Sequence, residues 1–447
     1  MRNVTSPAHP VFDANRPWSV RRPRVRRARS VSVHRSIHVA AYASLLAFCY
    51  SATSYALPLQ QPAMALGALI LLTEIVLGRH SLVLGGRPGL FLLLYSLAVA
   101  ASVPLSISFG TSFAGFQTVA KLTVMYIVTV NVATTRTRVY WLLIVLVILM
   151  AVYPGIGAIK FYLAGTTKAV GRANWRGLFG NANMVAMAML MHLPFAVAFF
   201  VTSKRTQWKL FWAIIGVILV AATVLTKSRA GFLAMVVLAV SGLVLSKRKL
   251  YIFGATALAV LVISVAAPPD FKERIATTFV SGEGQDQSIR MRREYWAIAV
   301  DIALDHPLIG VGIDNYERAN AQRMPSWMAG GLRYQDTHST FLNVWAEIGT
   351  PGAVVFFAAI VLLLLESRRA LHRALPGDPF ANYARAGTAA FIVFVTMGVF
   401  NSFQNAWFFF VLFAGQILLI QLLNARPALP SAAQRKVRRS ARLSQDQ

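Results

Sequence analysis

The chain has 447 residues, of which 56% are hydrophobic and only 13% are charged, and its mean hydropathy is +0.57. Soluble domains carry roughly 45–50% apolar and about 25% charged residues, so this composition excludes an ordinary soluble enzyme. The formal net charge is +28. That charge would suggest nucleic-acid binding in a soluble protein, but the positions of the basic residues along the chain indicate membrane topology instead.

Long apolar stretches predict an all-α polytopic membrane protein with about 12 transmembrane helices. A span takes about 20 mostly apolar residues, and these stretches run continuously instead of alternating as barrel strands do. The fourth stretch, which contains Lys121, is the weakest. The predicted spans are 37–57, 63–79, 89–107, 113–133, 140–163, 182–202, 208–226, 229–246, 249–267, 351–367, 386–402 and 405–424.

Basic residues alternate between the two sides of the predicted membrane. Residues 1–36 form a predicted disordered basic tail, and residues 425–447 form a second basic tail. With these tails and the even-numbered connections on one side, that side holds 29 of the 44 basic residues, against 14 on the other. Because Lys and Arg accumulate in cytoplasmic loops, both termini are predicted to be cytoplasmic, which requires an even number of spans.

The acidic residues follow another distribution, since 11 of the 16 fall within 268–350. This is the longest stretch outside the predicted spans, and it lies between the ninth and tenth of them on the outer side. A loop of this length is uncommon unless it carries function. The predicted organisation is therefore spans one to nine over 37–267, a large helical extracytoplasmic lobe over 268–350, and spans ten to twelve over 351–424.

Several basic residues lie on the outer side, where the orientation rule does not explain them. Guanidinium groups bind phosphate oxygens in a bidentate manner and keep their charge at physiological pH, so arginines converging from separate segments favour an anion such as a diphosphate. Pairing with lobe carboxylates or lipid phosphates is the alternative. The residues are Lys160, Lys168, Arg172, Arg176, Lys227, Arg229, Arg290, Arg292 and Arg293.

Two patterns in the lobe precede its histidine motif. Arg292 and Trp296 are four residues apart and share a helix face, although an interfacial helix with Tyr295 and Trp296 at head-group level would give the same pattern. The segment 307–312 reads Pro-Leu-Ile-Gly-Val-Gly and predicts a turn. It lacks the spacing of a nucleotide-binding loop, so we expect no nucleotide.

His338 is the candidate proton acceptor. The segment 336–349 predicts a short helix that Asp336 or Thr337 caps and Gly349 ends, which places His338 in its first turn. The positive end of the helix dipole and nearby arginines would favour the neutral imidazole. A metal held by His338, Asp336 and Glu347 is the alternative, but no HxxxH or HExxH spacing accompanies it, so we expect no metal and no other cofactor.

Taken in order, these motifs resemble the O-antigen ligase and O-antigen polymerase superfamily of bacterial inner membranes. The resemblance covers about residues 40–425 and rests on five pieces of sequence. They are Arg172-Ala-Asn-Trp-Arg-Gly-Leu-Phe-Gly-Asn-Ala-Asn183, Lys227-Ser-Arg-Ala-Gly231, Arg292 with Trp296, Pro307 to Gly312, and His338-Ser339 through Glu347-Ile-Gly349.

The resemblance implies an inverting glycosyltransferase. Such an enzyme moves a glycan from undecaprenyl diphosphate to an acceptor, lipid A–core oligosaccharide for a ligase, at the periplasmic face. By motif, His338 matches the general base, and Arg229 and Arg292 match the arginines that hold the diphosphate, with Arg176 and Arg290 beside them. Asn183, Lys227 and Asp336 are supporting candidates. Many relatives have Asn where this chain has Ser339, so no side-chain contact is assigned there.

Two other functions remain open at this point. A polymerase would join undecaprenyl-diphosphate-linked repeats to one another. A lipid-linked glycan transporter is suggested by Glu74, Lys121 and His192 in apolar runs, because ionisable residues in spans often line a transport path. The expected partners are the lipid-linked donor, the acceptor and membrane lipids, and we expect no nucleic acid.

Overall fold

A computed structural model describes residues 26–167, 171–245, 287–325 and 335–425, and every regular element in these ranges is helical. The predicted all-α class is therefore confirmed. The helices are α1 (Arg26–Ser54), α2 (Gln60–Val76), α3 (Gly86–Ser102), α4 (Phe109–Val132), α5 (Arg136–Met150), η1 (Ala151–Gly155), α6 (Ile156–Leu163), η2 (Gly177–Gly180), α7 (Ala182–Thr202), α8 (Thr206–Leu225), α9 (Arg229–Leu245), α12 (Gln287–Asp305), α13 (Tyr316–Arg323), α14 (Thr340–Arg373), α15 (Pro379–Gly398) and α16 (Trp407–Asn424).

Each predicted span within the described residues coincides with a helix. Six helices are long and apolar enough to cross a membrane: α4, α5 continued through α6, α7, α8, α14 and α16. Four shorter apolar helices lie in α1, α2, α3 and α9, while α15, which carries Arg385, is in neither group. The predicted ninth span, 249–267, lies outside the described residues, so the count of 12 stays a prediction.

Two helix boundaries differ from the predicted ones. Helix α1 begins at Arg26, so the helix starts within the segment predicted as a disordered tail. The predicted span 140–163 is divided by a π-helical turn, Ala151–Gly155, that contains Pro154. Proline has no backbone N–H to donate and its ring clashes with the preceding turn, so a π-bulge is a common adjustment at such a position.

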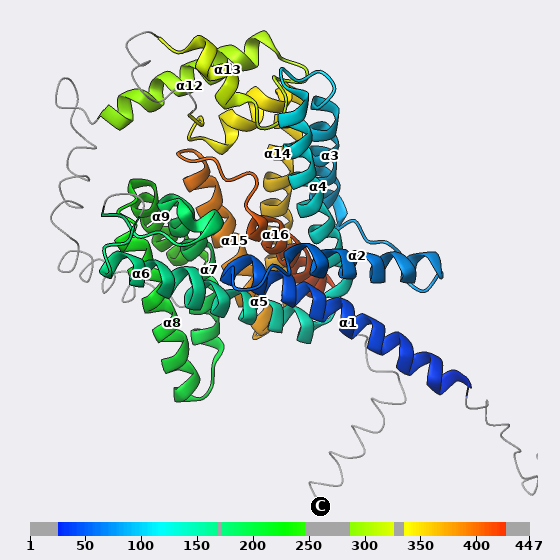
Figure 1. Ribbon diagram of the computed structural model, residues 1–447. Coiled ribbons are helices and arrows are strands. Elements are labelled where there is room, and N and C mark those ends of the chain that lie inside the picture. The colour runs from blue at the N-terminus through cyan, green and yellow to red at the C-terminus, as the bar shows by residue number, and fades with distance from the viewer. Residues whose placement is uncertain (1–25, 168–170, 246–286, 326–334, 426–447) are drawn as a thin grey trace, which may run out of the picture.

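Helix α16 occupies the centre of the bundle. All its residues from Trp407 to Ile420 are buried, as expected for a helix that is apolar on every side. Its one central amide joins three helices, since Gln416 Nε2 donates to Ser367 Oγ on α14 at 2.8 Å and to the Ala384 carbonyl on α15 at 3.1 Å. Around it, α14 packs on α3, and α15 packs on α7 and α9 (Figure 1).

Helices α12 and α13 lie across one end of the bundle, next to the beginning of α14 (Figure 1). A small apolar cluster that includes Ile302, Val311 and Tyr316 packs them against Ala346 of α14. Hydrogen bonds attach the same region to the α3–α4 connection, where Ile107 N–H donates to the Val311 carbonyl at 3.1 Å. The described part of the predicted lobe is therefore packed onto the helices beneath it.

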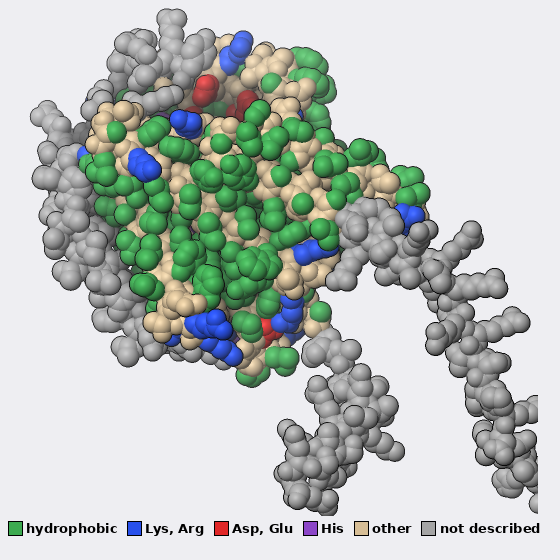
Figure 2. Space-filling view, turned by 60° about the horizontal axis from the view of Figure 1, so that its bottom comes forward, with side chains coloured by type: hydrophobic (Ala, Val, Ile, Leu, Met, Phe, Trp, Pro, Cys, Tyr) green, Lys and Arg blue, Asp and Glu red, His purple; other side chains and the backbone are tan. Residues whose placement is uncertain are grey.

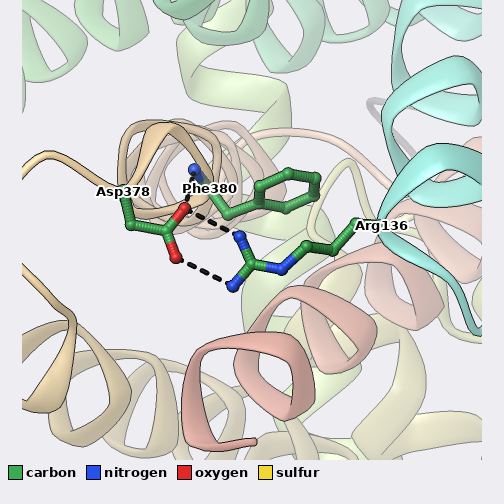
Figure 3. A network of polar contacts seen from close by, with 3 residues as sticks. All are labelled: Arg136, Asp378 and Phe380. Carbon is green, nitrogen blue, oxygen red and sulfur yellow. Dashed lines mark hydrogen bonds and ion pairs between the residues drawn. The ribbon is translucent and has the colours of Figure 1, made fainter. Parts of the chain in front are cut away.

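The opposite end of the bundle is joined by an ion pair between α5 and α15. Arg136 binds both carboxylate oxygens of Asp378, at 3.0 and 2.9 Å, and its guanidinium lies 4.8 Å from the centre of the Phe380 ring (Figure 3). Asp378 also caps α15, because it accepts the Phe380 N–H at 3.0 Å. The surface in Figure 2 has a broad hydrophobic area with lysine and arginine side chains along its lower margin. This distribution is typical of a helical membrane protein.

Candidate functional site

The loop that carries His338 is bound to the connection between α15 and α16. Thr340 is the main link, since its N–H and its hydroxyl both donate to the Asn401 carbonyl, at 3.0 and 2.7 Å. The same hydroxyl accepts the Phe403 N–H at 2.9 Å. The Ser402 hydroxyl donates to Asp336 Oδ1 at 2.7 Å. The residues on both sides of His338 are therefore held by a segment that lies far away in the sequence.

His338 precedes its helix, so the prediction that it lies in the first helical turn is wrong. The cap is Ser339, whose hydroxyl accepts the Leu342 N–H at 3.4 Å, and α14 begins at Thr340. His338 has a φ of +53°, a conformation that non-glycine residues adopt only uncommonly. Thr337 supports this turn, because its hydroxyl donates to the Ser339 carbonyl and accepts the Ser339 N–H.

The imidazole of His338 is half-buried between α12 and the loop. The Tyr295 ring meets it edge to face, with 6.1 Å between the ring centres. Burial lowers the pKa of His338; the Asp336 carboxylate raises it and the Arg292 guanidinium lowers it further, so the net shift is downward. The pKa of His338 shifts in the expected direction, but the largest cause is burial and not the helix dipole. Arg292 and Asp336 are thus close enough to His338 to shift its pKa in opposite directions.

Tyr295 is a site residue that the sequence analysis considered only as an interfacial aromatic. Its side chain is 2% exposed, and its backbone carbonyl accepts the Tyr316 hydroxyl at 2.8 Å. Trp296, on the neighbouring face of α12, contacts Phe400 at 6.2 Å between ring centres. An interfacial helix and a packed helix have the same amphipathic pattern, which is why only the structure distinguishes them. Arg290, near the start of α12, has an exposed side chain.

A second group of basic residues surrounds the connection between α8 and α9. Arg172 donates from Nε to the Thr226 carbonyl and from Nη2 to Asn183 Oδ1, both at 2.8 Å. Asn183 therefore positions Arg172, which the sequence analysis counted among the outer basic residues but did not assign to the diphosphate. The Arg176 guanidinium is exposed and lies 5.4 Å from the centre of the Trp175 ring.

Lys227 and Arg229 lie on either side of the residue that caps α9. The Ser228 hydroxyl accepts the Gly231 N–H at 3.1 Å, so α9 begins at Arg229. Lys227 has a φ of +50° and a buried side chain, and its ammonium group lies 5.6 Å from the centre of the Tyr162 ring. The guanidinium of Arg229 is half-buried at the helix start, where the positive end of the dipole favours anions.

The two groups lie at the same end of the bundle, on both sides of the beginning of α16. Phe179, in the loop that follows Arg176, stacks on Phe408 of α16 with 6.2 Å between ring centres. The connection just before α16 holds the His338 loop through Asn401 and Ser402. The predicted site residues are thus distributed over two neighbouring loops, and Arg292 belongs to the group around His338, whose pKa it lowers.

The glycine-rich turn 307–312 packs against the helix that follows His338. The Val311 N–H donates to the Ala346 carbonyl at 3.0 Å, and the Gly312 N–H donates to the Glu347 carbonyl at 2.8 Å. Gly310, at a φ of +73°, lies so close to Glu347 that a Cβ would overlap its backbone. This turn is therefore structural: it fixes the segment 340–349 beneath α12.

Carboxylates also gather near the loop. Partial burial and the charge of Asp336 raise the pKa of Asp314, while a hydrogen bond from Asn405 lowers it. Glu347 is buried, and one of its oxygens accepts the Tyr316 N–H at 3.3 Å. In the described ranges, no group of three or more His, Cys, Asp or Glu residues has the arrangement needed to hold a metal ion.

The three residues that suggested a transport path have separate surroundings. Glu74 is buried near the end of α2 and pairs with Arg79 at 3.7 Å. Lys121 is exposed on α4. His192 is buried in α7, where its Nδ1 bonds to the Ala188 carbonyl at 2.7 Å and its ring contacts Phe408 edge to face. Each of them thus has a local structural role or a surface position.

Comparison with known protein families gives one match. The family model described as O-antigen ligase matches residues 214–357, about a third of the chain. The matched range contains Lys227, Arg229, Arg292, Asp336 and His338, and leaves out the loop of Arg172 and Arg176. A comparison with curated proteins finds no match. The match over residues 214–357 thus confirms the resemblance of the chain to the O-antigen ligase superfamily.

Proposed function

We propose that the protein is an inverting, lipid-linked glycosyltransferase that moves O-antigen polysaccharide from undecaprenyl diphosphate to lipid A–core oligosaccharide. The reaction takes place at the periplasmic face of the bacterial inner membrane, with both termini in the cytoplasm. The observation that carries this proposal is the O-antigen ligase match over 214–357, which includes both Arg292 and His338. The influence of the Arg292 charge on the pKa of His338 supports a shared role in one reaction.

His338 is the proposed general base. Its lowered pKa keeps the imidazole neutral near pH 7, so it can accept the proton of the acceptor hydroxyl as that oxygen attacks the anomeric carbon. A positioned base of this kind typically contributes about 10²–10⁴ in rate. Attack on the face opposite the diphosphate forms the new glycosidic bond, breaks the bond to the leaving group and inverts the anomeric centre.

The arginines are proposed to stabilise the leaving group. As the glycosidic bond to phosphate breaks, negative charge grows on the diphosphate oxygens, and cations fixed at that place lower the barrier. Arg292 and Arg229 are the principal candidates, with Arg176 and Arg290 beside them. Lys227 and Asn183 support the second loop, and Asp336 stabilises the His338 imidazolium that forms during transfer. The proposed reaction uses no metal and no nucleotide.

Transfer by purified protein tests the assignment. The protein would be given undecaprenyl-diphosphate O-antigen with and without lipid A–core, in the presence of chelator and without nucleotide. We expect glycan on lipid A–core and released undecaprenyl diphosphate, both dependent on the acceptor. If the lipid-linked donor becomes longer while lipid A–core stays bare, the protein is a polymerase. If donor crosses a vesicle membrane without any transfer, it is a transporter.

A further inference from the structure

The end of the bundle opposite α12 contains a large cavity. It has a volume of about 1350 Å³ and lies between the last turns of α7, α9 and α14 and the first half of α15. Helix α14 is 34 residues long, so at about 1.5 Å of rise per residue this cavity lies some tens of ångströms from His338. It is therefore separate from the proposed transfer site.

The inner walls of the cavity are apolar. The apolar lining includes Leu364 and Leu365 of α14, Ile392 of α15 and Val244 of α9. Val244 and Ile392 also line a second, smaller space of about 290 Å³ beside Val240 of α9. The two spaces are thus adjacent: a wide chamber lies beside a smaller apolar groove, in which the Val240 and Val244 side chains are exposed.

Basic side chains surround the wide chamber. They are Lys204, Arg368, His372 and Arg385. In the part of the chain that the structure describes, none of them forms an ion pair with a carboxylate. Arg385 instead donates to Asn382 Oδ1 at 2.8 Å.

Among the described residues, Asp378 is the one acidic residue that lines the chamber, and it does not balance these charges. Asp378 is bound through both oxygens by Arg136, which is not among the lining residues, and it also accepts the Phe380 N–H (Figure 3). Its charge is therefore already compensated. The chamber is left with a net positive field next to an apolar groove, an arrangement that complements a phosphate with hydrocarbon chains attached.

We propose that this cavity binds one anionic, two-chain phospholipid. The phosphate contacts Lys204, Arg368 and Arg385, and one acyl chain follows the groove along α9. Cations accumulate generally at this end of the bundle, and that accumulation alone would account for Arg369 and Lys209, which do not line the cavity. It does not account for a basic chamber that lies beside an apolar groove. A single prenyl chain would fill the groove and leave most of the wider space empty. In the proposed orientation the lipid belongs to the cytoplasmic leaflet.

Lipid titration of the full-length protein tests this proposal without any glycan transfer. Wild-type protein in phosphatidylcholine nanodiscs would be titrated with phosphatidylglycerol, and bound lipid would be measured by native mass spectrometry. The cavity variant is Lys204→Gln with Arg368→Gln. Its matched control is Lys209→Gln with Arg369→Gln, which removes the same charge from exposed positions outside the cavity. All four positions are exposed, so both variants should keep the wild-type melting temperature.

We expect the cavity variant to bind phosphatidylglycerol at least about tenfold more weakly, and the control to stay within about twofold of wild type. Val244→Trp, which narrows the entrance to the groove, should also weaken binding without changing the charge. Equal losses in the two charge variants would mean diffuse attraction and would overturn the proposal. Equal binding of phosphatidylcholine, or tighter binding of undecaprenyl phosphate than of phosphatidylglycerol, would overturn it as well.

Discussion

His338 is held in a backbone conformation that L-residues rarely adopt. Its φ of +53° persists because the residues around it are fixed, Thr340 by the Asn401 carbonyl and Asp336 by the Ser402 hydroxyl. Non-glycine residues in this region cost of order 1–3 kcal/mol, and such strain is often found at functional sites. The surroundings of His338 thus maintain one orientation of the imidazole against Tyr295.

The charges beside His338 predict a characteristic pH dependence. The neutral imidazole is the active form, so the transfer rate should fall as pH decreases through the pKa of His338, with a midpoint below its ordinary 6.5. Arg292→Gln removes a positive charge that lowers this pKa, so its midpoint should move to higher pH. Asp336→Asn removes a negative charge that raises it, so its midpoint should move to lower pH.

The pH profile of kcat checks both shifts. Arg293→Gln is the matched control, because this arginine is next to Arg292 but has an exposed side chain. Midpoints that stay the same in all three variants, or that move together in one direction, would be evidence against His338 as the titrating base.

Asn183 gives a second prediction at this scale. Asn183→Ala removes the acceptor of a charged hydrogen bond from Arg172, so we expect a loss of about 1.5–3 kcal/mol of stability and a lower melting temperature in detergent. Asn183→Asp keeps an acceptor at the same position and adds a charge opposite the guanidinium. It should therefore melt at or above the wild-type temperature. An aspartate variant as unstable as the alanine variant would contradict this role.

Residue patterns in the sequence identify the ionisable side chains of the candidate site but not the groups that hold them. Motif positions point to His338 and Arg292, and the structure places the Arg292 charge close enough to lower the pKa of His338. Asn401 and Ser402 are polar residues without any motif, and Asn401 reaches Thr340 across a sequence separation of 61 residues. Such pairing depends on which helices pack together, and local patterns do not contain that information.

Among the elements, α14 has a kink whose cause is visible in the sequence. Gly349 has φ 72° and ψ 178°, so the predicted break at this residue is present, although the chain returns to a helix at once. A Cβ at Gly349 would lie 2.5 Å from the carbonyl carbon of Leu308. The kink therefore lets the turn 307–312 approach α14 closely.

Gly349→Ala should for this reason be strongly destabilising. It combines an unfavourable positive φ, worth about 1–2 kcal/mol, with a clash against backbone that cannot move aside. Gly78→Ala is the control, because Gly78 has a φ of +65° but open space around it. Its substitution therefore measures the cost of the positive φ without a clash. Melting temperatures in detergent should fall much further for Gly349→Ala than for Gly78→Ala. Equal decreases in melting temperature for the two variants would show that the close approach of Leu308 to Gly349 is unimportant.

The elements themselves could largely be predicted, because every apolar stretch in the described ranges is a helix. Their ends could be predicted less well. Hydropathy marks where a helix meets lipid, but α1 begins earlier, at Arg26, and α14, which begins at Thr340, joins the short helix predicted over 336–349 to the span predicted from 351. In both cases the helix extends beyond its apolar part, and hydropathy does not report such extensions.

For the whole molecule, the ion pair of Figure 3 links helices that are far apart in sequence, α5 and α15. Asp378→Asn keeps an oxygen that can cap α15 but loses the ion pair, which is worth about 0–1 kcal/mol for a partly exposed pair. Asp378→Ala also loses the cap, worth about 1 kcal/mol more. Melting temperatures should therefore fall in the order wild type, Asn variant, Ala variant. An Asn variant as unstable as the Ala variant would show that capping is not what Asp378 contributes.

For the molecule as a whole, the sequence predicts the fold class and the distribution of charge, whereas only the structure shows how the helices are arranged. Hydropathy and basic residues indicate a polytopic helical protein and suggest its orientation. They do not indicate that α16 is the central helix or that α14 packs on α3, because nearly every helix here is apolar on most sides. Packing among such helices depends on the shapes of their side chains, which a hydropathy profile does not record.

The most direct test of the account is glycan transfer to lipid A–core by His338→Ala, measured beside His306→Ala, a variant of an exposed histidine in the same lobe. The protein would be purified and assayed with chelator and without nucleotide. We predict a rate at least about 10²-fold below wild type for His338→Ala, with donor still bound, and a near-normal rate for His306→Ala. Normal transfer by His338→Ala would contradict the proposed mechanism, even though the family match over residues 214–357 would stand.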